Sequence, residues 1–174
     1  MRKKNKALVV GAGSIGKRQI DNFKKYFLID VADVRKDRLK EVQNRFKINN
    51  TFTDYKKALF KKNLYDIVFI TVPPHLHLDV AKRAVRFNSG IFIEKPLGMN
   101  INGWIKVYKE CQKKKLINYV AYCHRFVSYT NRLKNLLEKK IIGNIYCSHL
   151  KWSSYLPDWH PYENYKNFYM SKKH

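Results

Sequence analysis

The sequence lacks any apolar run of the ~18–20 residues that a membrane-spanning helix needs. Its N-terminus, MRKKNKALVVGAG, starts with basic residues, but the apolar run that follows is only four residues long and meets a glycine. It therefore has neither the hydrophobic region nor the small-residue cleavage site of a secretory signal peptide. We expect a cytoplasmic protein without membrane association.

Cysteine is also scarce. The three cysteines, Cys111, Cys123 and Cys147, are odd in number and far apart, and they form no CxxC motif or Cys/His cluster. A disulfide framework and a zinc site are therefore not expected. His75 and His77 have a spacing that suits a metal pair, but no carboxylate or third ligand accompanies them. We predict reduced thiols and no metal site.

Acidic residues are few, since 13 aspartates and glutamates stand against 36 lysines and arginines, for a formal net charge of +23. Such a charge is typical of nucleic-acid binders. The lysines, however, are spread through nearly every segment and build no helix-turn-helix, zinc-finger, RRM or KH signature. We interpret the charge as a lysine-rich surface with weak, salt-sensitive affinity for nucleic acid and no specific nucleic-acid partner. We therefore keep a basic nucleic-acid-binding protein only as the least favoured hypothesis for the function.

Short apolar runs alternate with segments of helical periodicity through the first two-thirds of the chain. Asp54 is placed to cap the third helix, after a short extended segment at 50–53. This alternation indicates right-handed βαβ units, and hence an α/β fold with a Rossmann-type, doubly wound parallel sheet. The predicted strands cover 6–13, 27–34, 65–74, 90–96 and 117–123, and the predicted helices cover 14–26, 35–46, 55–62, 76–87 and 101–114.

The last third of the sequence continues with an amphipathic helix at 127–140, whose inward side is predicted to carry Leu133, Leu136 and Leu137. Residues 141–156 are predicted to form a turn and a strand of rough alternation. The segment that follows is aromatic, polar and aperiodic. We therefore expect two domains, a dinucleotide-binding Rossmann domain at 1–122 and the beginning of an incomplete α+β domain at 123–174.

A glycine-rich motif, GAGSIG, stands directly after the first predicted strand and opens the first helix. In this setting Gly11 allows the tight turn, Gly13 lets the backbone approach a pyrophosphate, and Gly16 lets helix and strand pack closely. Helix N–H groups around Ser14 and Ile15 would bind the phosphates. The sequence predicts a dinucleotide site, the alternative being a glycine-rich turn in an α/β domain that binds no nucleotide.

The second predicted strand ends in Asp33, which lies 17 residues beyond Gly16. Its carboxylate would accept hydrogen bonds from the ribose hydroxyls on the adenine side and repel a 2′-phosphate. Arg35 and Lys36 follow at once and could accept that phosphate. We predict NAD as the cofactor, with NADP as the alternative.

The apolar run IFI at 91–93 ends in two charged residues, Glu94 and Lys95, directly before a proline. In an open α/β sheet, ligands bind outside the carboxyl ends of the strands. The glycine motif, Asp33 and the TVPPHLH segment at 71–77 also lie at such ends. We therefore expect Glu94 and Lys95 to face a cofactor crevice.

The segments GAGSIGKRQI, TVPPHLH, IFIEKPLG and AYCHRF, in this order and spacing, resemble the glucose–fructose oxidoreductase/inositol dehydrogenase (Gfo/Idh/MocA) family. The combination of GxGxxG with EKP is much more specific than either motif alone. The closing segment SSYLPDWHPYENYKNFY resembles the branch of the family that acts in bacterial surface-sugar metabolism. The resemblance implies NAD(P)-dependent oxidation or reduction of a carbon in a sugar, cyclitol or nucleotide-sugar substrate.

The resemblance also implies roles for individual residues near the cofactor. Lys95 corresponds to the catalytic lysine beside the nicotinamide, where it would hydrogen-bond the reacting oxygen, assist proton transfer and stabilise developing negative charge. Glu94 and His77 would contact the nicotinamide side, and Pro73 would shape the adjacent turn.

On the substrate side, the resemblance implies that Tyr122, His124 and Arg125 border the substrate together with Lys95. Arg125 suits a phosphate, a carboxylate or sugar hydroxyls. Two alternatives stay open, because His124 could be a capped strand-end histidine and Trp159 could be a core residue as easily as a sugar-stacking ring.

The sequence departs from the family pattern after FYMSKKH. Family members continue with a glycine-rich stretch, an aspartate and a histidine, in a second domain built on an open, mostly antiparallel sheet. The resemblance therefore implies a truncated chain, and we expect NAD(H) binding with little or no turnover and poor packing from about residue 141 onward. The alternative is a non-catalytic NAD(P)-binding module. A homo-oligomer is implied for full-length members, and that expectation does not extend to this shorter chain.

Overall fold

The computed structural model describes residues 5–159 and 164–167. The chain divides into two compact units, Met1–Tyr122 and Cys123–His174. We call the first the sheet unit and the second the C-terminal unit.

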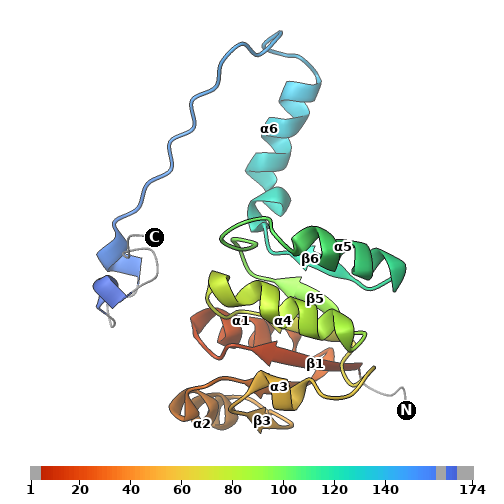
Figure 1. Ribbon diagram of the computed structural model, residues 1–174. Coiled ribbons are helices and arrows are strands. Elements are labelled where there is room, and N and C mark those ends of the chain that lie inside the picture. Colours follow the sequence, from red (N-terminus) through yellow and green to blue (C-terminus); the bar gives the residue numbers. More distant parts are fainter. Residues whose placement is uncertain (1–4, 160–163, 168–174) are drawn as a thin grey trace. The chain divides into compact units, whose positions relative to one another are not determined.

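Six parallel strands form the centre of the sheet unit (Figure 1). They are β1 (Asn5–Val10), β2 (Phe27–Ala32), β3 (Thr51–Phe52), β4 (Ile67–Ile70), β5 (Gly90–Ile93) and β6 (Asn118–Val120). Their order across the sheet is β3-β2-β1-β4-β5-β6. The chain thus winds outward from β1 in both directions, and the point between β1 and β4 is where open α/β sheets bind ligands. The predicted Rossmann-type parallel sheet is confirmed.

Helices cover both faces of this sheet. They are α1 (Ser14–Phe23), α2 (Lys36–Arg45), α3 (Tyr55–Ala58), α4 (Pro74–Arg86) and α5 (Trp104–Lys113). Side chains alternate between the two faces of a strand, so Ala7 and Val9 of β1 pack with α1 and α2, whereas Leu8 and Val10 pack with α3, α4 and α5. The central strands are therefore buried on both faces, as their continuous apolar sequences indicate.

Several helix boundaries differ from the predictions by a few residues, among them those of α4 and α3. The helix predicted from residue 76 begins at Pro74, because proline has the backbone angle of a first helical residue and its missing N–H has no intrahelical partner there in any case. The helix predicted over 55–62 ends at Ala58. Its predicted cap is confirmed, since the Asp54 carboxylate accepts a hydrogen bond from the Lys56 backbone N–H at 2.8 Å.

One charged residue lies in the core of the sheet unit. Asp30 of β2 is 4% exposed, and its carboxylate accepts hydrogen bonds from the Tyr65 hydroxyl at 2.8 Å and from the side-chain amides of Asn49 at 2.8 Å and Asn50 at 3.1 Å. A buried carboxylate is tolerated when its oxygens are paired in this way. Burial raises the pKa of Tyr65 above its ordinary range, and the hydrogen bond from its hydroxyl to Asp30 raises this pKa further.

The C-terminal unit begins with a short 3-10 turn, η1 (Cys123–Phe126), and continues with α6 (Ser128–Glu138). The helix is confirmed, but its predicted inward side is wrong: no residue of α6 is buried, and Leu133 and Leu136 are 49% and 40% exposed. An amphipathic pattern supplies an apolar face but not the surface that covers it.

The strand predicted within 141–156 is also wrong. Residues 145–155 carry no strand, and all of them are exposed. A strand needs a neighbouring strand to receive its hydrogen bonds, and none of the strand ladders among the described residues includes this segment. Two short 3-10 turns follow, η2 (Leu156–Trp159) and η3 (Tyr165–Asn167).

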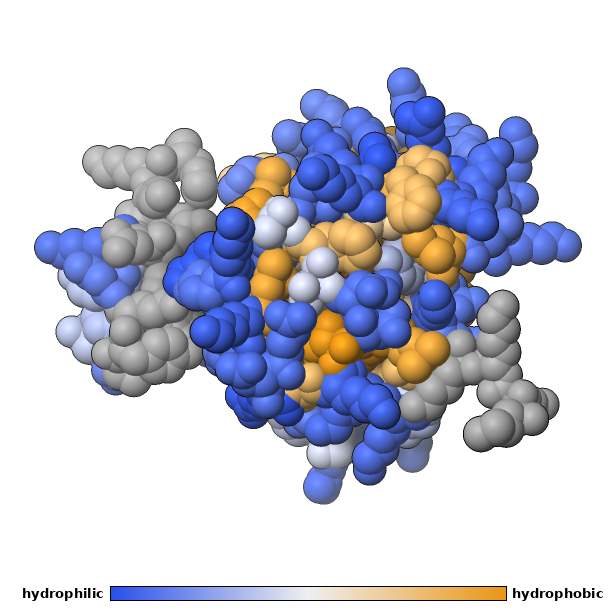
Figure 2. Space-filling model, turned by 90° about the horizontal axis from the view of Figure 1, so that it is seen from below, coloured by the Kyte–Doolittle hydropathy of each residue, from blue (hydrophilic) through white to orange (hydrophobic). Residues whose placement is uncertain are grey.

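Hydrophilic residues dominate the face of the molecule that is seen from below, where they surround a smaller group of hydrophobic residues (Figure 2). This agrees with lysines that are spread along the chain rather than gathered in one motif. Among the described residues, no helix is both long enough and apolar enough to cross a membrane.

Candidate functional site

The glycine-rich motif forms the turn between β1 and α1. Gly11 has a φ of +103°, and a Cβ atom at this position would lie 2.7 Å from the Thr71 carbonyl oxygen. A Cβ on Gly16 would lie 1.9 Å from the Gly11 carbonyl oxygen. The Thr71 hydroxyl lies 2.7 Å from that same Gly11 oxygen and donates to it. Only glycine fits at residues 11 and 16, so the start of α1 can pack directly against the turn.

Gly13 is different, because it has room around it. Its φ of −69° is open to any residue, and the nearest atom to an added Cβ is an Arg38 guanidinium nitrogen at 3.7 Å. Gly13 precedes α1, whose first turn has no side-chain cap and no acidic residue. The N–H groups of Ser14 and Ile15 thus stand at an uncapped, ten-residue helix, the arrangement that suits a phosphate group.

Asp33 lies immediately after β2, beside this turn. Its side chain is only 7% exposed. One carboxylate oxygen accepts from the Ala12 backbone N–H at 2.6 Å and the other accepts from the Arg35 backbone N–H at 2.8 Å. A carboxylate oxygen can accept more than one hydrogen bond, so Asp33 is held in place and still has acceptor capacity for ligand hydroxyls.

Two arginines lie near Asp33 and both are close to carboxylates. The Arg35 guanidinium donates to Asp37 through two nitrogens, Nε at 3.1 Å and one terminal nitrogen. This contact holds the pKa of the exposed Asp37 below its ordinary value. An Arg38 guanidinium nitrogen lies 4.0 Å from the Asp33 carboxylate. The predicted anion ligand Arg35 is therefore already occupied by an acidic neighbour.

Glu94 and Lys95 follow β5, which pairs with β4, the neighbour of β1. The Glu94 backbone N–H donates to the Ile70 carbonyl at 3.0 Å, and its side chain accepts from the Gln19 amide at 2.7 Å. Lys95 is exposed. The parallel register thus brings the end of β5 to the same edge of the sheet as the glycine turn and Asp33, as the sequence predicts.

His77 and Pro73 lie on the segment after β4. Pro73 is exposed at the start of α4. His77 is 1% exposed, and its ring nitrogens lie 2.7–3.2 Å from the carbonyl oxygens of Val72, Pro96 and Leu97. The structure thus surrounds His77 with backbone carbonyls, and its contact with the nicotinamide stays a prediction.

The predicted substrate residues are divided between the two units. Tyr122 ends the sheet unit and is 47% exposed. His124 and Arg125 lie in η1, and Trp159 ends η2. Within the C-terminal unit, His124 Nδ1 lies 2.8 Å from the Tyr129 hydroxyl, and its ring packs edge-on against Trp152 at 5.1 Å. Their role towards a substrate stays a prediction.

Sequence reasoning missed three residues of this region, namely Gln19, Arg38 and Thr71. A polar residue on the inward side of α1, three positions after Gly16, was the available signal for Gln19. Thr71 interrupts an apolar run, which was the signal for a hydroxyl at the end of β4. Arg38 carries no signal of its own, because it is one of many basic residues on exposed helix faces.

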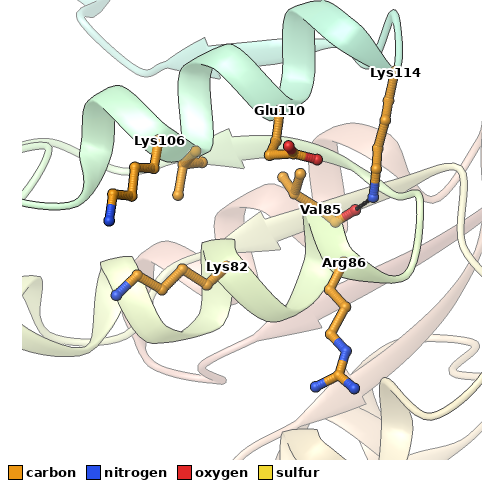
Figure 3. Close-up of a pocket in the computed structure, with 7 residues that line it drawn as sticks. Lys82, Val85, Arg86, Lys106, Glu110 and Lys114 are labelled. Carbon is orange, nitrogen blue, oxygen red and sulfur yellow. Dashed lines mark hydrogen bonds between the residues drawn. The ribbon is translucent and has the colours of Figure 1, made fainter.

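A separate hollow of about 350 Å³ lies between α4 and α5 (Figure 3). Lys82, Lys106 and Glu110 line it, and Lys114 donates to the Val85 carbonyl at 2.8 Å. Its residues come from the second half of α4, whereas the candidate site lies where α4 begins. The hollow therefore takes no part in the candidate site. Among the described residues, no cluster of histidine, cysteine and carboxylate side chains could hold a metal ion.

A glycine turn, an uncapped helix and an acidic residue beside the switch point of a parallel sheet are the features of a Rossmann-type nucleotide-binding domain. Residues 5–122 match the Gfo/Idh/MocA family, described as an oxidoreductase family with an NAD-binding Rossmann fold. The chain belongs to this family, and the resemblance of its motifs is confirmed.

Inositol and nucleotide-sugar dehydrogenases are among the similar proteins. Myo-inositol 2-dehydrogenase from Thermotoga maritima is 26% identical over 138 residues, which are 78% of this chain and 41% of that protein. Scyllo-inositol dehydrogenase from Lactobacillus casei, solved with NAD(H) and scyllo-inositol, has a TM-score of 0.72 at 22% identity and aligns over 82% of this chain and 43% of its own.

The WlbA dehydrogenase from Chromobacterium violaceum, solved with NADH and UDP-GlcNAcA, has a TM-score of 0.73 at 21% identity and aligns over 84% of this chain and 43% of its own. At these identities the solved structures show the fold alone. The chain spans about two-fifths of the length of the relatives that it matches.

Proposed function

We propose that the sheet unit binds NAD(H) and that Lys95 serves hydride transfer between the nicotinamide and a carbon of a sugar, cyclitol or nucleotide sugar. The observation that carries this proposal is the glycine turn, which leaves the first turn of α1 uncapped beside a fixed carboxylate, Asp33. The phosphates would lie at the N–H groups of Ser14 and Ile15, and the ribose hydroxyls at Asp33.

The surroundings of Asp33 favour NAD over NADP. A 2′-phosphate next to the Asp33 carboxylate is repelled unless a cation compensates for its charge. Arg35 is held by Asp37, so binding the phosphate would require the loss of that ion pair. Lys36 is exposed and keeps NADP as the second choice.

Lys95 supplies the proton chemistry in this proposal. The bound nicotinamide would accept the hydride from the substrate carbon during oxidation, or supply it during reduction. The Lys95 amine would hydrogen-bond the reacting oxygen and take part in the transfer of its proton, and its positive charge would stabilise an oxygen that becomes negative. Its exposure at the end of β5 leaves it accessible to a ligand.

The substrate class rests on the relatives, several of which are named as inositol dehydrogenases. Tyr122, His124, Arg125 and Trp159 are our proposed substrate contacts. A role in surface-sugar metabolism rests only on the sequence pattern of the segment 153–169, part of which lies outside the described residues.

NADH fluorescence titration tests the cofactor site. The 174-residue chain should bind NADH saturably, and Asp33→Ala should weaken binding by about tenfold or more, because a hydrogen bond to a charged group contributes about 1.5–3 kcal/mol. Asp21→Ala is the matched control, since Asp21 is an exposed carboxylate on α1 whose ion-pair partner is Lys24.

Two results would contradict the proposal. One is the absence of saturable NADH binding, and the other is equal binding by the wild type and Asp33→Ala. Little or no turnover is expected of this chain alone, so saturable binding without turnover even in the presence of a complementary subunit would favour the alternative of a non-catalytic NAD(P)-binding module.

A further inference from the structure

We propose that Gln19 and His77 are positioning residues for Lys95, which they serve by holding the residues on either side of it, Gln19 through the Glu94 side chain and His77 through the backbone after Lys95. The inference rests on the role that the proposed function gives to Lys95. It goes beyond that function because neither side chain needs to touch the substrate.

Gln19 holds the residue before the lysine. Its side chain comes from α1, is 8% exposed, and donates from Nε2 to Glu94 Oε1 at 2.7 Å. The Glu94 backbone is itself bonded to Ile70. Because α1 also presents the proposed phosphate site, this hydrogen bond links the cofactor end of α1 to the residue next to Lys95.

His77 holds the residues after the lysine. From α4, its Nδ1 lies 3.1 Å from the Pro96 carbonyl oxygen and 3.2 Å from that of Leu97, while Nε2 lies 2.7 Å from the Val72 carbonyl oxygen. Carbonyl oxygens only accept hydrogen bonds, and a neutral imidazole carries a single N–H. His77 lies between the segment after β5 and the segment after β4, and the tautomer with its hydrogen on Nδ1 donates to the segment that follows Lys95.

Lys95 lies between these two attachments and is itself exposed. Among the described residues, its amine forms no hydrogen bond or ion pair. The location of the amine thus depends on the neighbouring residues that Gln19 and His77 hold, and a displacement of about 1 Å in a catalytic group can cost about a hundredfold in rate. Two side chains that together fix residues 94–97 are therefore suited to positioning the lysine.

Hydrogen exchange and lysine NMR test this inference on the intact chain. We would measure amide exchange of Glu94, Lys95, Leu97 and Gly98, since Pro96 has no amide hydrogen, and the resonance of ¹³C-dimethylated Lys95, assigned with Lys95→Arg. Gln19→Leu and His77→Phe should each speed exchange in this segment by about tenfold and shift or broaden the lysine resonance. His77→Gln, which keeps a donor amide, should restore part of the wild-type signal.

Two exposed helical residues serve as matched controls for these variants. His75→Phe changes an exposed histidine of α4, and Gln112→Leu changes an exposed glutamine of α5. Neither should alter exchange at 94–98 or the Lys95 resonance. The melting temperature of every variant would be measured alongside.

The inference fails if Gln19→Leu and the folded His77 variants leave both signals unchanged. It also fails if exchange rises evenly along the chain, in proportion to lost stability, because Gln19 and His77 would then be merely structural. If His77→Phe does not fold, His77→Gln and Gln19→Leu decide the outcome. An absence of NADH binding by the wild type would overturn the proposed function instead, and the two failures are thus distinguishable.

Discussion

The glycine turn allows packing and cofactor binding to be separated by two substitutions of the same kind, Gly16→Ala and Gly13→Ala. A Cβ on Gly16 would lie 1.9 Å from the Gly11 carbonyl oxygen, a backbone atom that cannot rotate away. Insertion of a methyl group into a packed site typically costs about 1–3 kcal/mol. We therefore expect Gly16→Ala to lower the free energy of unfolding by at least that amount.

Gly13→Ala should behave in the opposite way. The φ of Gly13 is −69°, and the nearest atom to an added Cβ is the end of a flexible side chain at 3.7 Å. The methyl group should change stability by less than about 1 kcal/mol, because the smaller number of unfolded conformations favours alanine whereas glycine is the better N-cap residue. The same methyl group would occupy space next to the proposed pyrophosphate, so NADH binding should weaken by about tenfold.

Urea denaturation followed by circular dichroism measures the first effect, and NADH fluorescence titration measures the second. The reasoning predicts that Gly16→Ala loses stability whereas Gly13→Ala loses only cofactor affinity. Equal stability of Gly16→Ala and the wild type would refute the packing argument. Wild-type NADH affinity in Gly13→Ala would refute the placement of the pyrophosphate.

Three further outcomes follow from the surroundings of single residues. Asp37→Ala should remove the ion pair between Arg35 and Asp37 and improve NADPH binding relative to NADH binding by about two- to fivefold. Parallel titrations with the two cofactors measure this, and an unchanged ratio of the two affinities would exclude Arg35 from the choice of cofactor. Tyr65→Phe should lower the free energy of unfolding by about 1.5–3 kcal/mol, because it removes a buried hydrogen bond to Asp30; urea denaturation measures this, and a loss below about 0.5 kcal/mol would contradict it. Burial raises the pKa of the Cys111 thiol. A chromogenic disulfide reagent should therefore react quickly with the two exposed cysteines, and with Cys111 only after unfolding. Fast reaction of all three thiols in the native protein would contradict the buried position of Cys111.

The parallel sheet could be predicted because its signals are local. Apolar runs, helical periodicity and the glycine motif each occupy a short stretch of sequence. The predicted ends of helices and strands are less accurate. The strand predicted over 65–74 is β4, which covers only Ile67–Ile70, because an apolar run does not show where the hydrogen bonds between strands stop. The grouping of the glycine turn, Asp33 and Glu94 at one edge followed correctly from the rule that parallel strands share their carboxyl ends.

What could not be predicted depends on contacts between distant residues. Gln19 and Glu94 are separated by 75 positions, and nothing near either residue in the sequence indicates the other. His77 of α4 has its ring towards backbone carbonyls, and nothing in the TVPPHLH segment indicates those contacts. Leu133 and Leu136 form an apolar pattern on α6 that no described side of the C-terminal unit buries. Each case depends on a partner that local periodicity does not specify.

The most direct test of the account is a crystal structure of the 174-residue chain with NAD(H). The account predicts the pyrophosphate at the N–H groups of Ser14 and Ile15, the adenine-side ribose hydroxyls on the Asp33 carboxylate, and the nicotinamide next to Lys95. A cofactor bound elsewhere, or bound with its nicotinamide away from the end of β5, would contradict it.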